Sequence, residues 1–146
     1  MTSSKSLDLS SIEKAITQLE TSLNYYHSNL SQHNEELKKL FIAATIQAFE
    51  FSYELSVKFL RRYLEMSEPS AGLIEEMSFP NLIRTVCERG LLQNDWQTWK
   101  HYRDKRNITS YTYDEVKAHE VMTVIPEFLE EIKYLLNKLK ERIKTL

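Results

Sequence analysis

The strongest constraint on the fold is the scarcity of residues that end helices or form tight turns. The 146-residue chain contains only two glycines and three prolines. All-β folds need many turns, and those turns depend heavily on such residues. The apolar residues also recur every three or four positions, as they do along one side of a helix. The sequence therefore predicts an all-α protein.

The apolar pattern divides into about five helices with short connections, which predicts an up-and-down helical bundle. Capping residues support the boundaries, among them Ser78, Gly90 and Asp114. In chain order, the predicted helices cover about residues 9–30, 35–66, 78–90, 94–106 and 114–143. Residues 31–34 and 67–72 are predicted connections. We expect one domain over residues 1–146, with residues 1–8 as a flexible N-terminus.

The predicted helix over residues 35–66 is apolar on more than one side. One face would form the core, and a second apolar face favours burial against another copy of the chain. A central helix surrounded by its own neighbours is the alternative. We expect a homodimer. The apolar residues on several faces are Phe41, Ile42, Ile46, Phe49, Phe51, Tyr53, Leu55, Val57 and Phe59.

Composition excludes several classes of protein. The formal net charge of −2 argues against a protein that coats nucleic acid without selectivity. The single cysteine, Cys87, rules out an internal disulfide and favours a reducing compartment. No apolar run approaches the roughly 18 residues that span a bilayer, and no secretory signal is recognised, so we expect a cytoplasmic protein. The four histidines form no metal-binding pattern, and no phosphate-binding loop occurs, so we expect neither a metal nor a cofactor.

Residues 100–106 carry an unusual local charge. Four cations stand against the single Asp104, an excess of three positive charges on a net-acidic chain. Stabilisation of cations by the dipole at a helix C-terminus explains this pattern. Phosphate binding by the arginines, with tyrosines stacking on bases, is the alternative explanation. The residues concerned are Lys100, Tyr102, Arg103, Lys105, Arg106, Tyr111 and Tyr113.

A carboxylate pair, Glu50 and Glu54, lies at helical spacing among aromatic residues. Such a pair can be tuned for proton transfer. More often, carboxylates at this spacing face solvent or pair with a lysine or an arginine. Both interpretations stay open from the sequence.

Residues 106–115, RNITSYTYDE, resemble the signature of HEPN-domain proteins. More narrowly, they resemble nucleotidyltransferase substrate-binding proteins, the HepT-like partners of MNT-type nucleotidyltransferases. Residues 47–56, QAFEFSYELS, are similar to the pattern of this group in its second helix. The resemblance implies a homodimeric helical bundle with the arginine motifs of both protomers along a shared cleft. In active members that cleft cuts RNA without metal, and the protein is the toxin of a toxin–antitoxin pair. The antitoxin is the nucleotidyltransferase encoded nearby, which adds AMP to a tyrosine of the motif.

The resemblance assigns roles to individual residues of the motif. It implies that Arg106 is the motif arginine, Asn107 the polar position and Tyr113 the acceptor of AMP. Tyr111 stands where active members have histidine, so the catalytic pair would be Arg106 and Tyr111. Nucleotide or RNA would be bound by Tyr102, Arg103, Lys105, Arg106 and Asn107.

The tyrosine at position 111 weighs against ribonuclease activity. Histidine exchanges protons near neutral pH, whereas tyrosine, with a pKa near 10, is a poor base there. Lowering that pKa by about 3 units requires roughly 4 kcal/mol of differential stabilisation. Three interpretations follow: a partner subunit with little or no catalysis, a ribonuclease in which Tyr111 or His101 replaces the histidine, and a structural interaction module.

Overall fold

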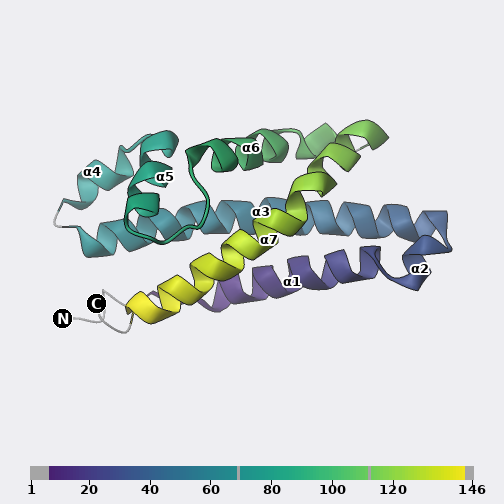
Figure 1. The fold of residues 1–146 in the computed structure, drawn as a ribbon, viewed down its shortest axis with the longest axis horizontal. Helices are drawn as coiled ribbons and strands as arrows, with labels where there is room; N and C mark the ends of the chain where they lie inside the picture. Colours follow the sequence, from purple (N-terminus) through teal and green to yellow (C-terminus); the bar gives the residue numbers. More distant parts are fainter. Residues whose placement is uncertain (1–6, 69, 112, 144–146) are drawn as a thin grey trace.

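The computed structural model describes residues 7–68, 70–111 and 113–143. These residues form helices and connections, and no strand occurs among them. The all-α prediction is confirmed. The helices pack as a bundle in which α1 and α3 lie side by side and antiparallel, and α7 crosses both (Figure 1).

Within the residues that the structure describes, the bundle consists of five longer helices and two helices of about one turn. They are α1 (Ser10–Tyr26), α2 (Asn29–Gln32), α3 (Glu35–Ser67), α4 (Ala71–Glu75), α5 (Phe79–Glu88), α6 (Trp96–Asn107) and α7 (Glu115–Ile143). A 3₁₀ turn, η2 (Thr109–Tyr111), connects α6 to α7. The predicted number of about five long helices is therefore confirmed.

Two predicted boundaries are wrong, and local capping explains the first. The first helix ends at Tyr26 instead of continuing to residue 30, because Ser28 starts a new turn. The Ser28 hydroxyl accepts a hydrogen bond from the backbone N–H of Ser31, as N-cap residues do. The predicted loop over residues 67–72 also contains the start of α4.

The other helix ends follow the sequence signals. The side chain of Ser78 caps α5, and that of Asp95 caps α6 by accepting from the backbone N–H of Thr98. Gly90, just beyond α5, has a φ of 77°, a conformation that glycine adopts without the strain imposed on other residues. Asp114 accepts from the first backbone N–H groups of α7.

The predicted flexible N-terminus covered residues 1–8, and residues 1–6 lie outside the described residues. Leu7 is only 8% exposed and packs in the hydrophobic core. The carboxylate of Asp8 accepts a hydrogen bond from the backbone N–H of Ser10. Leu7 therefore packs against the bundle, whereas Asp8 is exposed at the start of α1.

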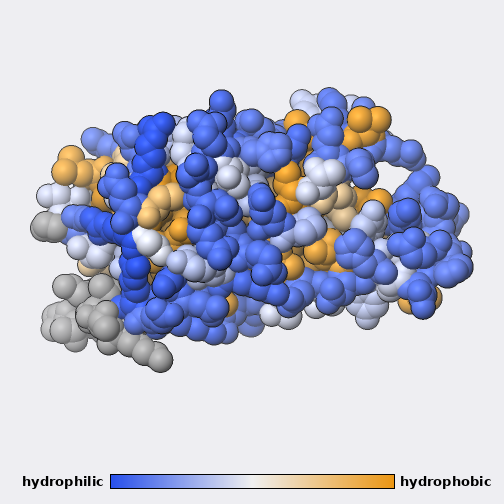
Figure 2. Space-filling model, in the orientation of Figure 1, coloured by the Kyte–Doolittle hydropathy of each residue, from blue (hydrophilic) through white to orange (hydrophobic). Residues whose placement is uncertain are grey.

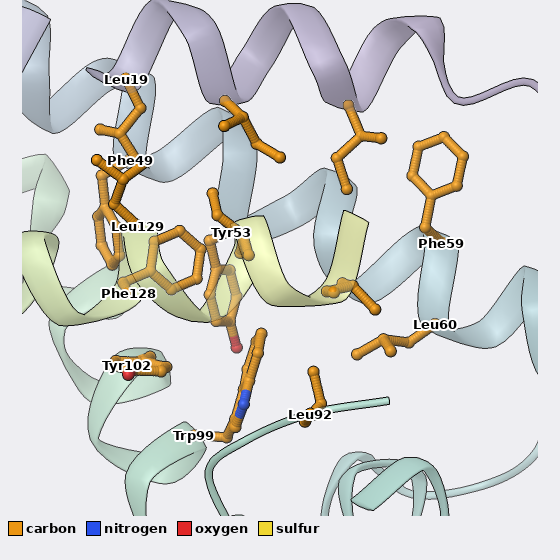
Figure 3. Close-up of a cluster of buried hydrophobic side chains, with 14 of the residues drawn as sticks. Leu19, Phe49, Tyr53, Phe59, Leu60, Leu92, Trp99, Tyr102, Phe128 and Leu129 are labelled. Atoms are coloured by element: carbon orange, nitrogen blue, oxygen red, sulfur yellow. The ribbon is translucent and has the colours of Figure 1, made fainter. Parts of the chain in front are cut away.

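Aromatic side chains form the part of the core that positions α6 (Figure 3). Phe128 of α7 lies at its centre, with ring centroids 5.0 Å from Phe49 of α3 and 5.2 Å from Tyr102 of α6. Trp99 and Tyr53 complete the cluster. Edge-to-face pairs of this kind contribute roughly 0.5–1.5 kcal/mol each beyond area burial. The cluster fixes α6 against α3 and α7.

A buried carboxylate fixes the start of α6. Glu131 of α7 is fully buried and accepts three hydrogen bonds, at 2.8 to 3.0 Å. The donors are the backbone N–H groups of Gln93 and Asn94 and the indole N–H of Trp99. A buried anion is tolerated when donors surround it in this way. Nothing in the sequence pattern distinguishes Glu131 from the exposed glutamates of the same helix.

Candidate functional site

The residues of the motif gather at the turn from α6 to α7. Arg106 lies in the last turn of α6, Tyr111 ends η2, and Tyr113 precedes the cap of α7. The hydroxyl of Thr109 donates to the Arg106 carbonyl at 2.8 Å, which closes the end of α6 into the 3₁₀ turn. Thr112 lies outside the described residues.

Arg106 is held between two carboxylates of α3. Its guanidinium lies 3.2 Å from an oxygen of Glu50 and 3.2 Å from an oxygen of Glu54. Glu50 also accepts from the Thr109 hydroxyl at 3.1 Å. Of the two interpretations of the carboxylate pair, the structure shows the one in which it partners an arginine.

This arrangement sets the electrostatics of the motif. The Arg106 side chain is 28% exposed, so it remains accessible at one side. Two carboxylates against one guanidinium give the cluster a net negative charge. A phosphate group must therefore compete with Glu50 and Glu54 for the N–H groups of Arg106.

The other cations near Arg106 have different partners. The Arg103 guanidinium lies over the rings of Trp96 and Phe79, 5.3 and 5.7 Å from their centroids, in cation–π contacts. Lys105 lies 3.7 Å from Glu120 of α7. Asn107, at the end of α6, is exposed. Arg103 and Arg106 therefore contact separate neighbours on separate helices.

The structure corrects the expectation that Tyr102 stacks on bases. Its side chain is fully buried in the aromatic core, and its hydroxyl donates to Glu127 at 3.0 Å. Burial, and secondly the hydrogen bond to Glu127, raise the pKa of Tyr102 above its ordinary range. A buried ring cannot meet a nucleobase at the surface, so Tyr102 serves the core.

Tyr111 and Tyr113 lie at the surface. Tyr111 is 45% exposed, with the ammonium of Lys117 4.6 Å from its ring centroid. Tyr113 is 84% exposed, the largest exposure among the large apolar and aromatic side chains in the described residues. Of the two, the hydroxyl of Tyr113 is the more accessible to a large reactant such as another protein.

His101, the other candidate for the missing histidine, lies on α6 and is exposed. It precedes Arg106 by five residues, which corresponds to roughly 140° around a helix of 3.6 residues per turn. The imidazole and the guanidinium therefore project from different sides of α6. This placement disfavours His101 as the proton carrier for chemistry at Arg106.

A cavity of about 500 Å³ lies beside Tyr113, between the start of α3 and the start of α7. Lys38 of α3 and His119 of α7 are among its lining residues. No sequence motif indicated these residues, because they come from helices about 80 residues apart along the chain and only packing brings them together.

Among residues 7–68, 70–111 and 113–143, no three His, Cys, Asp or Glu side chains are grouped so as to hold a metal ion. None of the described helices combines the length and the apolar character needed to cross a bilayer.

Comparisons with known proteins agree over most of the chain. A family model described as nucleotidyltransferase substrate binding protein like matches residues 7–141. A Haemophilus influenzae protein named probable ribonuclease HepT is 43% identical over 101 residues, which cover 69% of this chain and 68% of that protein. The solved structure of HI0074 from Haemophilus influenzae, described as the fold of a substrate-binding domain of a nucleotidyltransferase, superposes with a TM-score of 0.85. It shares 34% identity and covers 91% of this chain and 99% of its own.

Proposed function

The chain belongs to the family of nucleotidyltransferase substrate-binding proteins, and on this premise we propose that it is the HEPN-type partner subunit of a two-component nucleotidyltransferase system. The resemblance inferred from residues 47–56 and 106–115 is confirmed at the level of the family. The partner would be a small nucleotidyltransferase encoded nearby. In this proposal the chain presents Tyr113 for the addition of AMP.

The exposure of Tyr113 is the observation that supports this proposal most strongly. At 84% exposure, its phenol can enter the active site of a second protein without any unfolding of the bundle. In the transfer, the phenol oxygen forms a bond to the α-phosphorus of ATP, and the bond from that phosphorus to the pyrophosphate oxygen breaks. Pyrophosphate leaves, and the phenol proton passes to a base of the nucleotidyltransferase or to water.

The contacts of Arg106 favour a role in binding over a role in catalysis. Arg106 is oriented by Glu50 and Glu54 and is reachable from solvent at one side. Arginine suits phosphate because its N–H groups form paired, charge-assisted hydrogen bonds. Arg106, with Asn107, Lys105 and Arg103 around it, would hold a nucleotide or an RNA phosphate weakly, in competition with the carboxylates.

We also propose that two chains associate through α3. Leu40 and Phe51 are 64% and 53% exposed, and eleven residues, about three helical turns, place them on one face of α3. Ala44 and the polar Gln47, both exposed, lie between them on this face. An exposed apolar stripe on a central helix is typical of a protein interface. It lies beside the Glu54–Arg106 ion pair, so a homodimer would place two motifs near one another.

Ribonuclease activity is the second candidate function, and the similarity to the protein named probable ribonuclease HepT favours it. Tyr111 would have to supply the proton transfer that histidine performs in active members. A phenol is a much poorer proton acceptor than an imidazole at neutral pH. We therefore propose that any cleavage of RNA by this chain is slow.

Intact mass measurement tests the main proposal. The purified chain is incubated with the neighbouring nucleotidyltransferase, magnesium and ATP, and the wild type should gain the mass of one or more AMP units. Tyr113→Phe should gain none, whereas Tyr111→Phe serves as the matched control and should be modified normally. Addition of AMP to Tyr113→Phe would assign the acceptor elsewhere.

A further inference from the structure

The cavity beside Tyr113 has the size and the shape of a small-molecule site. Its volume of about 500 Å³ lies within the range of roughly 300–1,000 Å³ that is typical of ligand pockets. Its walls come from the end of α1, the start of α3 and the start of α7. The space-filling view shows the molecule hollowed at this end (Figure 2). The cavity is thus formed by the end of α1 and the start of α3, which are close in sequence, together with the start of α7, which is about 80 residues further along.

One part of the lining is apolar. Ile42 and Ala43 of α3 face Ala118 and Met122 of α7 across the cavity, and the ring of Tyr26 lines it from α1. Flat aromatic ligands gain affinity from aliphatic, thioether and aromatic surfaces of this kind. A nucleobase presents such a flat face, and stacking on an aromatic side chain is largely independent of the identity of the base.

The remaining lining is charged. Lys38 is half-buried and forms no ion pair within the described residues. Lys39 lies 3.7 Å from Glu115, but both side chains are largely exposed, so this pair is weak. An ammonium without a partner is suited to a phosphate. The carboxylates of Glu35 and Glu115 can accept hydrogen bonds from ribose hydroxyls or from an exocyclic amino group.

We propose that this cavity is a mononucleotide site, and that it receives the AMP attached to Tyr113. The base lies against the apolar wall and the phosphate lies at Lys38. Tyr113 itself lines the cavity, so a nucleotide on its hydroxyl needs no displacement of the core to enter. The inference that AMP attached to Tyr113 enters the cavity rests on the proposed function. The inference that the cavity binds free AMP does not.

Methionine methyl groups provide a direct measurement on the unmodified chain. Met122 lines the cavity, whereas Met66, in the last turn of α3, and Met77, just before α5, lie outside it. With ¹³C-methyl-labelled methionine, millimolar AMP should shift the Met122 signal and leave the Met66 and Met77 signals in place. Inorganic phosphate, which lacks the base and the ribose, should shift none of the three. An unmoved Met122 signal, or equal shifts with phosphate, would overturn the proposal.

Two substitutions assign the binding to the named residues. Lys38→Ala should weaken AMP binding by about fivefold, as expected for the loss of one partly exposed charged contact to phosphate. Lys58→Ala is the matched control, an exposed lysine of the same helix about 30 Å further along, and should bind like the wild type. Ala43→Trp fills the cavity from the exposed side of α3 and should abolish the shift of Met122. Unchanged binding by Lys38→Ala and Ala43→Trp would place the site elsewhere.

The modified chain separates this inference from the proposed function. If the mass of Tyr113 does not change but free AMP shifts Met122, the cavity is a nucleotide site and the acceptor assignment fails. If AMP is attached to Tyr113 and the Met122 signal stays at its unmodified position, Tyr113 is the acceptor but the attached AMP does not enter the cavity.

Discussion

Replacing Glu131 with glutamine should lower the free energy of unfolding by about 2 kcal/mol. Two of its three donors, Asn94 and Trp99, bond to one carboxylate oxygen, and Gln93 bonds to the other. A glutamine carbonyl can take the place of the first oxygen, although as a neutral acceptor it forms weaker bonds. The amide N–H₂ would then face the Gln93 N–H, and one buried donor without an acceptor costs about 1–3 kcal/mol. The smaller desolvation cost of the neutral amide offsets part of the loss.

Urea unfolding followed by far-ultraviolet circular dichroism measures this change, because the described residues are largely helical and this signal does not depend on Trp99. The urea concentration at the midpoint of unfolding should fall, whereas the slope of the unfolding free energy against urea concentration should not change. Glu130→Gln is the matched control, since Glu130 is adjacent, its side chain is 71% exposed, and it only forms a long ion pair with Lys133. This control should change the free energy by less than about 0.5 kcal/mol. All variants are compared at one protein concentration, because association would contribute to the measured stability.

The reasoning is refuted if Glu131→Gln unfolds at the same urea concentration as Glu130→Gln. A second variant adds a sharper condition. Trp99→Phe removes one of the three donors, so the effects of Glu131→Gln and Trp99→Phe should be non-additive by about 1 kcal/mol. Exact additivity would show that the indole N–H bond to Glu131 contributes nothing to stability.

Three other predictions concern association, catalysis and pH. Phe51→Asp places a charge in the exposed stripe of α3, so it should convert a dimer to a monomer. Light scattering measures the molar mass that distinguishes the two states. A variant that remains dimeric would exclude this face. Tyr111→His should raise cleavage of a labelled RNA by about 10²-fold or more, because a positioned acid or base contributes roughly 10²–10⁴-fold. Adding Arg106→Ala should remove the gain, and equal cleavage by the wild type, the single variant and the double variant would argue against this site. Burial raises the pKa of Tyr53 from 10.0 to about 12, so the unfolded chain loses this proton first and stability should fall as the pH rises from 10 to 12. The Tyr53→Phe variant lacks this phenol. Its free energy of unfolding, measured by denaturation from pH 10 to pH 12, should therefore fall by less than that of the wild type.

The fold was largely predictable because local patterns specify helices. The helical spacing of apolar residues and the caps at Ser78 and Asp114 predicted the starts of α5 and α7 correctly. The first helix was extended too far, because the sequence pattern remains apolar through Leu30 and the cap at Ser28 is a weak signal. Such boundaries depend on single hydrogen bonds, which periodicity does not detect.

The candidate site was predictable only in part. The order of Arg106, Tyr111 and Tyr113 in the chain predicted a functional turn, and the structure places all three at one turn between two helices. The burial of Tyr102 was not predicted, because a tyrosine in a basic segment has no sequence feature that separates a core ring from a surface ring. Its neighbour Arg103 illustrates the same limit, since its contact with Phe79 joins α6 to α5.

Local sequence patterns suffice to specify the helical class, the order of the helices and the motif at the turn from α6 to α7. These features depend on residues that are close together in the chain. Only the tertiary structure decided that Glu50 and Glu54 hold Arg106, that Glu131 fixes the start of α6, and that Lys38 and Met122 line a cavity beside Tyr113. These contacts join residues tens of positions apart. Helix packing sets such distances, and they determine which charges are paired and which remain available to a ligand.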